Sequence, residues 1–251
     1  MPSLVQVFFF DIDGVLAVPY RPYDLDGFSR LVQASRHPKA PTVAICTGRA
    51  YPYAEAVAQF LGASGPVLFE AGAGCFDLQQ GITRWHPALT EAVRAELGTI
   101  AAWLQREIVP GKDLSFDFGK RAQAGVIGPN PSEVEDALPI VEAYVKRHHP
   151  TFVVWHTEVS IDVVPRALTK ADGIAWGATL AGATLEATAF MGDSNGDVGA
   201  LERVAFAFAP QNAAPSVKSV TGIRVTTGSI LDGALEAFEA CITLNEAHGR
   251  G

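Results

Sequence analysis

The stretch "VQVFFFDIDGVLAVP", residues 5–19, carries the strongest fold signal in the chain. Its first half is a continuous run of valine and phenylalanine, which is typical of a strand buried on both faces of a parallel sheet. The run ends in two acids, Asp11 and Asp13, separated by one apolar residue. In a strand these carboxylates would lie on one face and repel each other unless a cation lies between them or the chain turns. The stretch therefore predicts a buried strand with a pair of acids at its end.

The composition is that of an ordinary globular protein. The chain has 251 residues, of which 48% are hydrophobic and 18% are charged. A chain of this length can bury one sizeable core and a smaller second one. The formal net charge is −8, and no block rich in lysine or arginine offsets the acids, which argues against a nucleic-acid partner. An acidic protein that handles a phosphate must use local positive groups or a metal ion.

Three cysteines, Cys46, Cys75 and Cys241, have neither metal-binding nor redox spacing. We therefore expect reduced, buried thiols in a cytoplasmic protein. The N-terminal apolar run is about seven residues long, lacks a basic start and meets Asp11 too soon for a signal peptide or a membrane span. We expect the whole chain to be mature and soluble, with no membrane partner.

Short apolar runs alternate with longer helical patterns, as in a parallel sheet whose strands are joined by helical crossovers. The candidate core strands are "VQVFFF", "TVAIC", "PVLF", "ATAFM" and "RVAFAF". Polar clusters follow three of them, at Asp11, at Thr47 and in the loop "GDSNGD", residues 192–197. Because ligands bind beyond the carboxyl ends of the strands in an open α/β sheet, we expect these clusters to converge on one site.

The middle of the chain has a different pattern. From Thr90, apolar residues recur every three or four positions, which predicts a helix. Two strands follow, and in the first of them, "LSFDF", Leu114, Phe116 and Phe118 alternate with polar residues. A second helix contains Pro139, which we expect to kink or delay it. The strands "TFVVWHT" and "EVSIDVV" complete the block.

This α-β-β-α-β-β order predicts an inserted α+β domain over residues 85–166. The two segments of the core would then be residues 1–84 and 167–251. We expect short hinges at the junctions, because no long linker rich in glycine or serine marks either of them.

Oxygen-rich clusters indicate a metal site. A hard divalent ion such as Mg²⁺ would remove the repulsion between Asp11 and Asp13. The loop "GDSNGD" places Asp193 and Asp197 after another strand, where they could complete an oxygen cage. Each cluster also has an ordinary structural interpretation, a surface turn with solvated acids, and neither cluster alone decides between the two.

Two further positions could contact a phosphate. The sequence "CTGR" places a hydroxyl, a flexible backbone and a cation, Thr47–Arg49, at a strand end, although Thr47 could equally be a helix cap. Lys170, in "VPRALTKADG", falls in the predicted first turn of a helix, where a cation works against the helix dipole. Lys170 could be a solvated surface residue, or it could neutralise a phosphoryl group or hold a nucleophile.

The order, strand ends and spacing of these clusters resemble the haloacid dehalogenase superfamily of phosphohydrolases. Its four motifs are similar, in order, to Asp11–Gly14, Thr47–Arg49, Lys170, and Gly192–Asp193 with Asp197. The insertion resembles the type II cap of the Cof-like branch, which includes sugar-phosphate phosphatases and phosphomannomutases. "FLGASGPVLFEAGAG" and "APQNAAPSVKSV" also resemble that branch, and "FLGxxGPV" and "GDSN" are most similar to archaeal-type phosphoglycolate phosphatases.

The resemblance implies a Rossmann-like α/β core with an inserted cap and Mg²⁺-dependent hydrolysis of a small phosphate monoester, either a sugar phosphate or a phosphorylated acid such as phosphoglycolate. It implies that Asp11 attacks phosphorus and forms an aspartyl-phosphate. Asp13 would protonate the leaving alcohol and then activate the water that hydrolyses the intermediate. The implied metal ligands are Asp11, the backbone carbonyl of Asp13 and Asp193, with Asp197 close by.

The implied phosphoryl contacts are Thr47, the Gly48 amide and Lys170. The candidate substrate contacts are Arg49, Arg121 and Asn212, and the cap turns also carry Lys120 and His156. A cap that closes would exclude water and add specificity. For each cap residue, a solvated turn is an equally good interpretation.

Two positions depart from the family pattern. Gly196 stands where the fourth motif usually has asparagine, so we expect Asn195 or water to supply that oxygen. Ala71 stands where the branch usually has asparagine, which puts a substrate contact there in doubt. Two other functions stay open: a phosphomannomutase-like transfer, and a regulatory or phosphate-binding module in which a strand-end acid is phosphorylated. The oligomeric state is not predicted.

Overall fold

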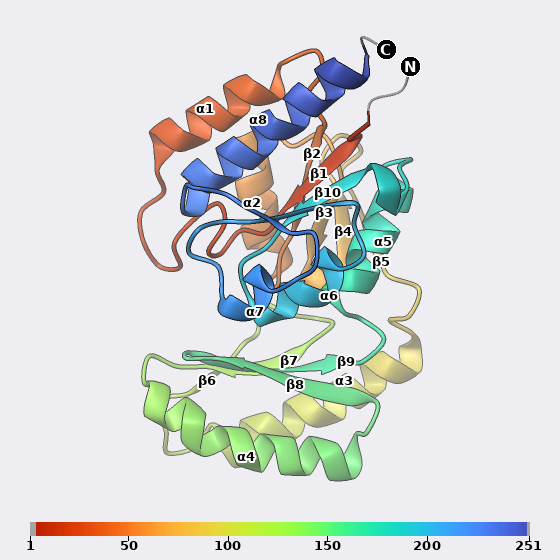
Figure 1. Cartoon of the computed structure of the whole chain (residues 1–251). Helices are drawn as coiled ribbons and strands as arrows, with labels where there is room; N and C mark the ends of the chain where they lie inside the picture. Colours follow the sequence, from red (N-terminus) through yellow and green to blue (C-terminus); the bar gives the residue numbers. More distant parts are fainter. Residues whose placement is uncertain (1–3, 250–251) are drawn as a thin grey trace. The chain divides into compact units, whose positions relative to one another are not determined.

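The computed structural model describes residues 4–249, which divide into two compact units (Figure 1). One unit runs to Arg84 and resumes at Thr169, and the other is Trp85–Leu168. The second unit therefore interrupts the first along the sequence.

The first unit is built on an eight-stranded sheet in the order β12-β11-β10-β1-β2-β3-β4-β5. The strands are β1 (Val7–Phe10), β2 (Thr42–Cys46), β3 (Val67–Phe69), β4 (Gly74–Asp77), β5 (Ile82–Trp85), β10 (Thr188–Met191), β11 (Phe206–Ala209) and β12 (Arg224–Val225). The strands from β12 to β3 pair in parallel, and β4 pairs antiparallel with β3. The predicted α/β class is confirmed, and β1, β2, β3, β10 and β11 overlap the five predicted strands.

Strand β1 is fully buried at the centre of this sheet. Phe8 stacks on Phe10 with 4.2 Å between ring centroids and on Phe208 of β11 at 5.6 Å. Phe238 covers both rings of β1, at 5.7 and 5.9 Å. Burying one such side chain contributes about 1.5–3 kcal/mol, and aromatic residues also favour the pleated strand. The phenylalanine run therefore fixes β1 between β2 and β10.

The helices of the first unit are α1 (Leu25–Ser35), α2 (Tyr51–Leu61), α5 (Lys170–Leu180), α6 (Val198–Leu201), α7 (Pro215–Lys218) and α8 (Ile230–His248). Two 3₁₀ turns of this unit, Glu70–Gly72 and Asn195–Asp197, follow β3 and β10. Helices α1 and α8 lie side by side (Figure 1).

A buried asparagine, Asn245, links α8 to the segments that precede β1 and β2. The side-chain oxygen of Asn245 accepts a hydrogen bond from the Val5 amide at 2.8 Å. Its side-chain nitrogen donates to the carbonyls of Val5 and Lys39, each at 2.9 Å. Because all three partners are backbone groups, one side chain ties α8 to the segments that lead into β1 and β2.

The second unit contains a four-stranded antiparallel sheet in the order β6-β7-β9-β8. Its elements are α3 (Glu91–Trp103), a π-helical turn (Leu104–Ile108), β6 (Ser115–Phe116), β7 (Ala124–Ile127), α4 (Pro131–His148), β8 (Phe152–Thr157) and β9 (Ser160–Pro165). Helices α3 and α4 cover one face of the sheet (Figure 1). The predicted α-β-β-α-β-β order is confirmed.

Local details of the second unit differ from the expectations. The strand predicted to alternate through Phe118 shrinks to the two residues of β6, and the Phe118 side chain is 80% exposed. The alternation through Phe118 is therefore wrong, because the chain turns before that residue reaches the sheet. Pro139 neither delays nor ends α4, which begins eight residues earlier with Asn130 as its cap.

All three cysteines are free and buried, as expected. Across residues 4–249, the structure contains no helix that combines the length and the apolar character needed to span a membrane.

Candidate active site

Polar side chains follow three neighbouring strands of the core sheet. Asp11 follows β1, Thr47 follows β2, and Asp193 comes two residues after β10. Strand β1 pairs in parallel with both β2 and β10, so the three carboxyl ends lie at one edge of the sheet. The expected convergence of the clusters therefore holds for the core residues.

Three carboxylates gather at this edge. Asp11, Asp193 and Asp197 each place one oxygen so that all three atoms lie within 4.8 Å of one another. Asp11 and Asp197 are buried, whereas Asp193 is half-buried. Gly14 makes this approach possible, because a Cβ atom there would lie 1.9 Å from Asp193 Oδ2 and the residue has a φ of +76°.

The ammonium of Lys170 lies between two of these acids. Lys170 Nζ is 2.5 Å from Asp11 Oδ2 and 2.5 Å from Asp197 Oδ1, and the side chain is buried. Lys170 is the first residue of α5, whose start is fixed by reciprocal hydrogen bonds between Thr169 and Asp172. A cation at a helix start is unfavourable, and two buried carboxylates offset that penalty here.

The second oxygen of Asp197 organises the loop after β10. Oδ2 accepts hydrogen bonds from the amides of Asp193 and Ser194, at 3.1 and 2.9 Å, and from the Ser194 hydroxyl at 2.8 Å. Asp197 therefore orients both Lys170 and the segment that carries Asp193. Sequence reasoning missed Ser194, although a serine three residues before an acid is the pattern of a capping box.

The electrostatics of the cluster follow from burial. Burial raises the pKa of Asp11 to about 7, against the lowering effect of Lys170 and with a further rise from Asp197. Burial and the charge of Asp197 raise the pKa of Asp193 to about 6. Although burial works against it, Asp11 and Asp197 hold the pKa of Lys170 well above its usual value.

This donor set fits a hard divalent cation. Three carboxylates share one ammonium, so full ionisation leaves negative charge in a desolvated site. Mg²⁺ prefers carboxylate oxygens and would lower the energy of the ionised forms. The residues that could hold it are Asp11 and Asp193, with Asp197 beside them.

The carboxylate of Asp13 has a different partner. Arg49 binds it through two parallel hydrogen bonds, Nε to Oδ2 at 2.6 Å and Nη2 to Oδ1 at 2.9 Å. Hydrogen bonding to Asp13 raises the pKa of Arg49. The three-carboxylate cluster is therefore formed without the Asp13 side chain, and its expected metal contact, through the backbone carbonyl, stays a prediction.

The loop after β2 supplies groups suited to an anion. Thr47 Oγ1 accepts a hydrogen bond from the Arg49 amide at 3.2 Å, and the Thr47 carbonyl accepts one from Ala71 at 2.8 Å. A Cβ atom at Gly48 would meet no atom within 4 Å, so the loop has open space there. Ala71 has a φ of +58°, a conformation that asparagine adopts more readily than alanine.

Two predicted side chains are engaged within the protein. Asn212 donates to the Gly14 carbonyl at 2.9 Å and accepts from the Ile230 amide at 2.8 Å, so it ties the Gly14 turn to the start of α8. Asn195 accepts a hydrogen bond from Ser216, and this contact turns its side-chain oxygen to helix α7. Neither contact supplies a ligand to the carboxylate cluster.

The cap candidates all belong to the second unit. Lys120 pairs with Asp162 at 2.6 Å and with Asp117 at 3.7 Å, so its charge is already balanced there. Arg121 and His156 are exposed. Their contacts with a substrate stay predictions.

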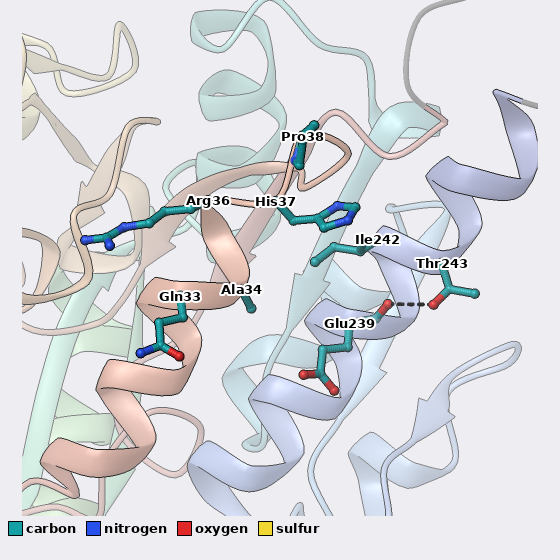
Figure 2. Close-up of a pocket in the computed structure, with 8 residues that line it drawn as sticks. All are labelled: Gln33, Ala34, Arg36, His37, Pro38, Glu239, Ile242 and Thr243. Atoms are coloured by element: carbon teal, nitrogen blue, oxygen red, sulfur yellow. Dashed lines mark hydrogen bonds between the residues drawn. The ribbon is translucent and has the colours of Figure 1, made fainter.

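A hollow of the first unit lies away from these carboxylates. It has a volume of about 540 Å³ and lies between the end of α1 and α8. Figure 2 shows the residues that line it, Gln33, Ala34, Arg36, His37, Pro38, Glu239, Ile242 and Thr243. Pro38 precedes β2 and Thr47 follows it, so the hollow and the carboxylates lie at opposite ends of that strand. The hydroxyl of Thr243 is bonded to the Glu239 carbonyl of its own helix. The carboxylate cluster is therefore outside this hollow.

A family model described as haloacid dehalogenase-like hydrolase matches residues 126–237, which include Lys170, Asp193 and Asp197. Over this segment the chain is similar to haloacid dehalogenase-like hydrolases. It is also 27% identical over 235 residues to a phosphoglycolate phosphatase of Natronomonas pharaonis, with 91% of this chain and 94% of the relative covered. The predicted resemblance to this superfamily and the predicted enzyme class, a phosphatase, are thereby confirmed.

Solved structures of other proteins share the fold. A protein of Thermoplasma acidophilum superposes with a TM-score of 0.77 at 18% identity, covering 96% of this chain and 99% of the other. A subclass IIB sugar phosphatase of the haloacid dehalogenase superfamily gives a TM-score of 0.68 at 20% identity, with coverages of 94% and 98%. The whole described fold is therefore that of these proteins.

Proposed function

We propose that this phosphatase hydrolyses a small phosphate monoester in a Mg²⁺-dependent reaction through an aspartyl-phosphate on Asp11. One observation carries the proposal: two carboxylates at the end of one strand have different cation partners, Lys170 for Asp11 and Arg49 for Asp13. Different surroundings suit two different roles, because one carboxylate attacks phosphorus while the other exchanges a proton.

The first step transfers the phosphoryl group to the protein. An oxygen of Asp11 attacks phosphorus while the bond from phosphorus to the alcohol oxygen breaks, and Asp13 gives its proton to that oxygen. The Ile12 amide donates to Asp11 Oδ1 at 2.7 Å and Lys170 binds Oδ2, so both oxygens of the nucleophile are oriented. Such orientation lowers the activation free energy, because the nucleophile loses little conformational entropy in reaching the transition state.

The second step returns Asp11 to its starting form. Asp13 takes a proton from a water molecule, which attacks phosphorus and breaks the bond to Asp11, and inorganic phosphate leaves. Thr47, the Gly48 amide and Lys170 would hold the phosphoryl oxygens in both steps. Mg²⁺ held by Asp11 and Asp193 would supply further stabilisation of negative charge.

For the substrate, we propose a phosphorylated small acid such as phosphoglycolate, or a sugar phosphate. The name of the Natronomonas pharaonis relative supports the first, and the subclass IIB sugar phosphatase supports the second. We further propose that residues 85–166 act as a cap over the site, with Arg121 as a substrate contact. The free cysteines support a reducing compartment such as the cytoplasm.

The test combines a phosphate-release screen with a trapped intermediate. Purified protein is assayed with Mg²⁺ or with a chelator against phosphoglycolate, sugar phosphates, nucleotides and p-nitrophenyl phosphate. We expect release only with Mg²⁺. Asp13→Asn should lower kcat roughly a hundredfold to ten-thousandfold and accumulate a phosphorylated protein whose label maps to Asp11 by mass spectrometry.

Label on Asp13, or on any serine or histidine, would overturn this mechanism. If the wild-type protein releases no phosphate from any ester in the presence of Mg²⁺, the regulatory or binding interpretation replaces it.

A further inference from the structure

Arg49, the partner of Asp13, is held by two tyrosines. Its guanidinium carbon lies 5.1 Å from the ring centroid of Tyr20 and 5.0 Å from that of Tyr53. Both distances are within the range of cation–π attraction. Two ring contacts restrict a long side chain that would otherwise sample many rotamers.

The two tyrosines come from different segments. Tyr53 is on α2, and its hydroxyl accepts a hydrogen bond from the Tyr23 hydroxyl at 2.8 Å. Tyr23 in turn packs edge-on against Phe28 of α1, at 5.4 Å between centroids. Tyr53 is therefore fixed at its far end by a chain of contacts that leads into the buried face of α1.

Tyr20 is held in an unusual backbone conformation. Its φ is +59°, in the left-handed region that a bulky residue adopts only when its surroundings determine it. The residue is 73% exposed, so burial of the ring does not account for the conformation. This turn brings the ring into contact with Arg49.

The Asp13–Arg49 pair needs such support. The two side chains are 28% and 30% exposed, and an ion pair with this exposure is weak and mobile unless its geometry is fixed. Proton transfer requires the carboxylate within hydrogen-bond reach of the leaving oxygen. We propose that Tyr20 and Tyr53 are positioning residues that act through Arg49 to aim Asp13 at the leaving group. This role rests on the proposed function, in which Asp13 is the acid.

The test compares two esters that differ mainly in the acidity of the leaving group, phenyl phosphate and p-nitrophenyl phosphate. The parameter is kcat/KM, which reports the first step alone. Phenolate needs protonation more than nitrophenolate does, so a misaimed Asp13 affects phenyl phosphate more. In Tyr53→Leu we expect kcat/KM to fall about tenfold for phenyl phosphate and less than about threefold for p-nitrophenyl phosphate.

Matched variants separate positioning from structure. Tyr53→Phe keeps the ring and should recover most of the loss. Tyr51→Leu changes a tyrosine on the same helix that packs on Phe69 and Phe76, and it should affect both esters equally. If Tyr53→Leu fails to fold, Tyr20→Asn repeats the test at an exposed position, because asparagine tolerates a positive φ.

Equal losses for the two esters, or no loss, in a folded variant without the ring would overturn the proposal. So would a tenfold loss in Tyr53→Phe, because the hydroxyl would then matter and the ring would not. Failure of the proposed function is seen separately, as a wild-type protein that hydrolyses neither ester.

Discussion

Asp11 and Asp13 lie two residues apart at the end of β1, and each binds a cation, but their surroundings are opposite. Asp11 and Lys170 expose only 7% and 9% of their side chains, whereas Asp13 and Arg49 expose 28% and 30%. A buried pair is strongly destabilising to break, because either charge would be left without solvent or partner. A half-exposed pair can open at little cost.

This difference suits the two roles proposed for the acids. The nucleophile must stay oriented throughout, and the contact between Asp11 and Lys170 holds its carboxylate in place while favouring its ionised form. The acid-base group must release and regain a proton in each cycle, so Asp13 is paired where solvent can offset its change of charge. The end of β1 thus provides two carboxylates, one in a buried ion pair and one in a partly exposed ion pair.

The largest effect is expected when Asp11, the buried member of the two acids, is replaced. Asp11→Asn should lower turnover at least about ten-thousandfold and abolish covalent phosphorylation, because an amide is a poor nucleophile. Intact-mass spectrometry after incubation with p-nitrophenyl phosphate and Mg²⁺ measures the label. Asp13→Asn is the matched control, since it removes a carboxylate from the same strand end and should still be labelled. A labelled Asp11→Asn protein would contradict the assignment.

The next effect compares the stabilities of the two pairs. Lys170→Met leaves Asp11 and Asp197 buried without their cation, and it should lower the free energy of unfolding by about 3–5 kcal/mol at neutral pH with a chelator present. Arg49→Met should lower it by only about 1 kcal/mol. Urea denaturation followed by circular dichroism measures both. Similar losses in the two variants would mean that burial does not distinguish the pairs.

The smallest effect is a pH dependence confined to the buried cluster. An acid with a raised folded pKa binds its proton more tightly when folded, so stability falls as pH rises from the unfolded value to the folded one. For Asp11 the pKa rises from 3.8 to about 7, and for Asp193 it rises from 3.8 to about 6, so these values bound the two pH windows. Without divalent cations, we expect stability to fall by roughly 1–3 kcal/mol between pH 4 and 7 relative to Asp193→Asn.

Thermal unfolding at several pH values with a chelator measures this slope, and added Mg²⁺ should reduce it. Parallel pH profiles for the wild-type protein and Asp193→Asn would show that Asp193 does not titrate in this window.

The sequence predicted the core of the site because its signals are local. The run before Asp11 and the runs before Thr47 and Asp193 are apolar strands, and parallel strands bring their carboxyl ends together. The pairing of Lys170 with Asp197 could not be predicted, because the rotamer of a lysine at a helix start depends on acids from other segments. The proposed role of Lys170 came from the family resemblance, whereas its partners Asp11 and Asp197 are seen only in the structure.

The misses also have physical causes. The turn at Tyr20 has no glycine to mark its positive φ, so nothing in the sequence indicated that this ring reaches Arg49. Phe118 extends the alternation of apolar and polar residues in the sequence, but the strand ends before it. Such alternation predicts a strand only where a neighbouring strand is present to pair with it. Pro139 was expected to disturb α4, yet packing of Val134, Ala137, Val141 and Val145 against the sheet holds the helix on both sides of it.

The position of β1 sets an order of assembly during synthesis. Its neighbour β10 pairs Thr188 with Val7, about 180 residues later in the chain, a separation that takes roughly 10–35 s to translate. The segment Trp85–Leu168 is complete before that strand emerges, so it can fold first on the ribosome. Until β10 arrives, the phenylalanine edge of β1 lacks a partner and is a site for chaperones or aggregation. Asn245 closes the core last, because the residue that fastens Val5 lies in the final helix.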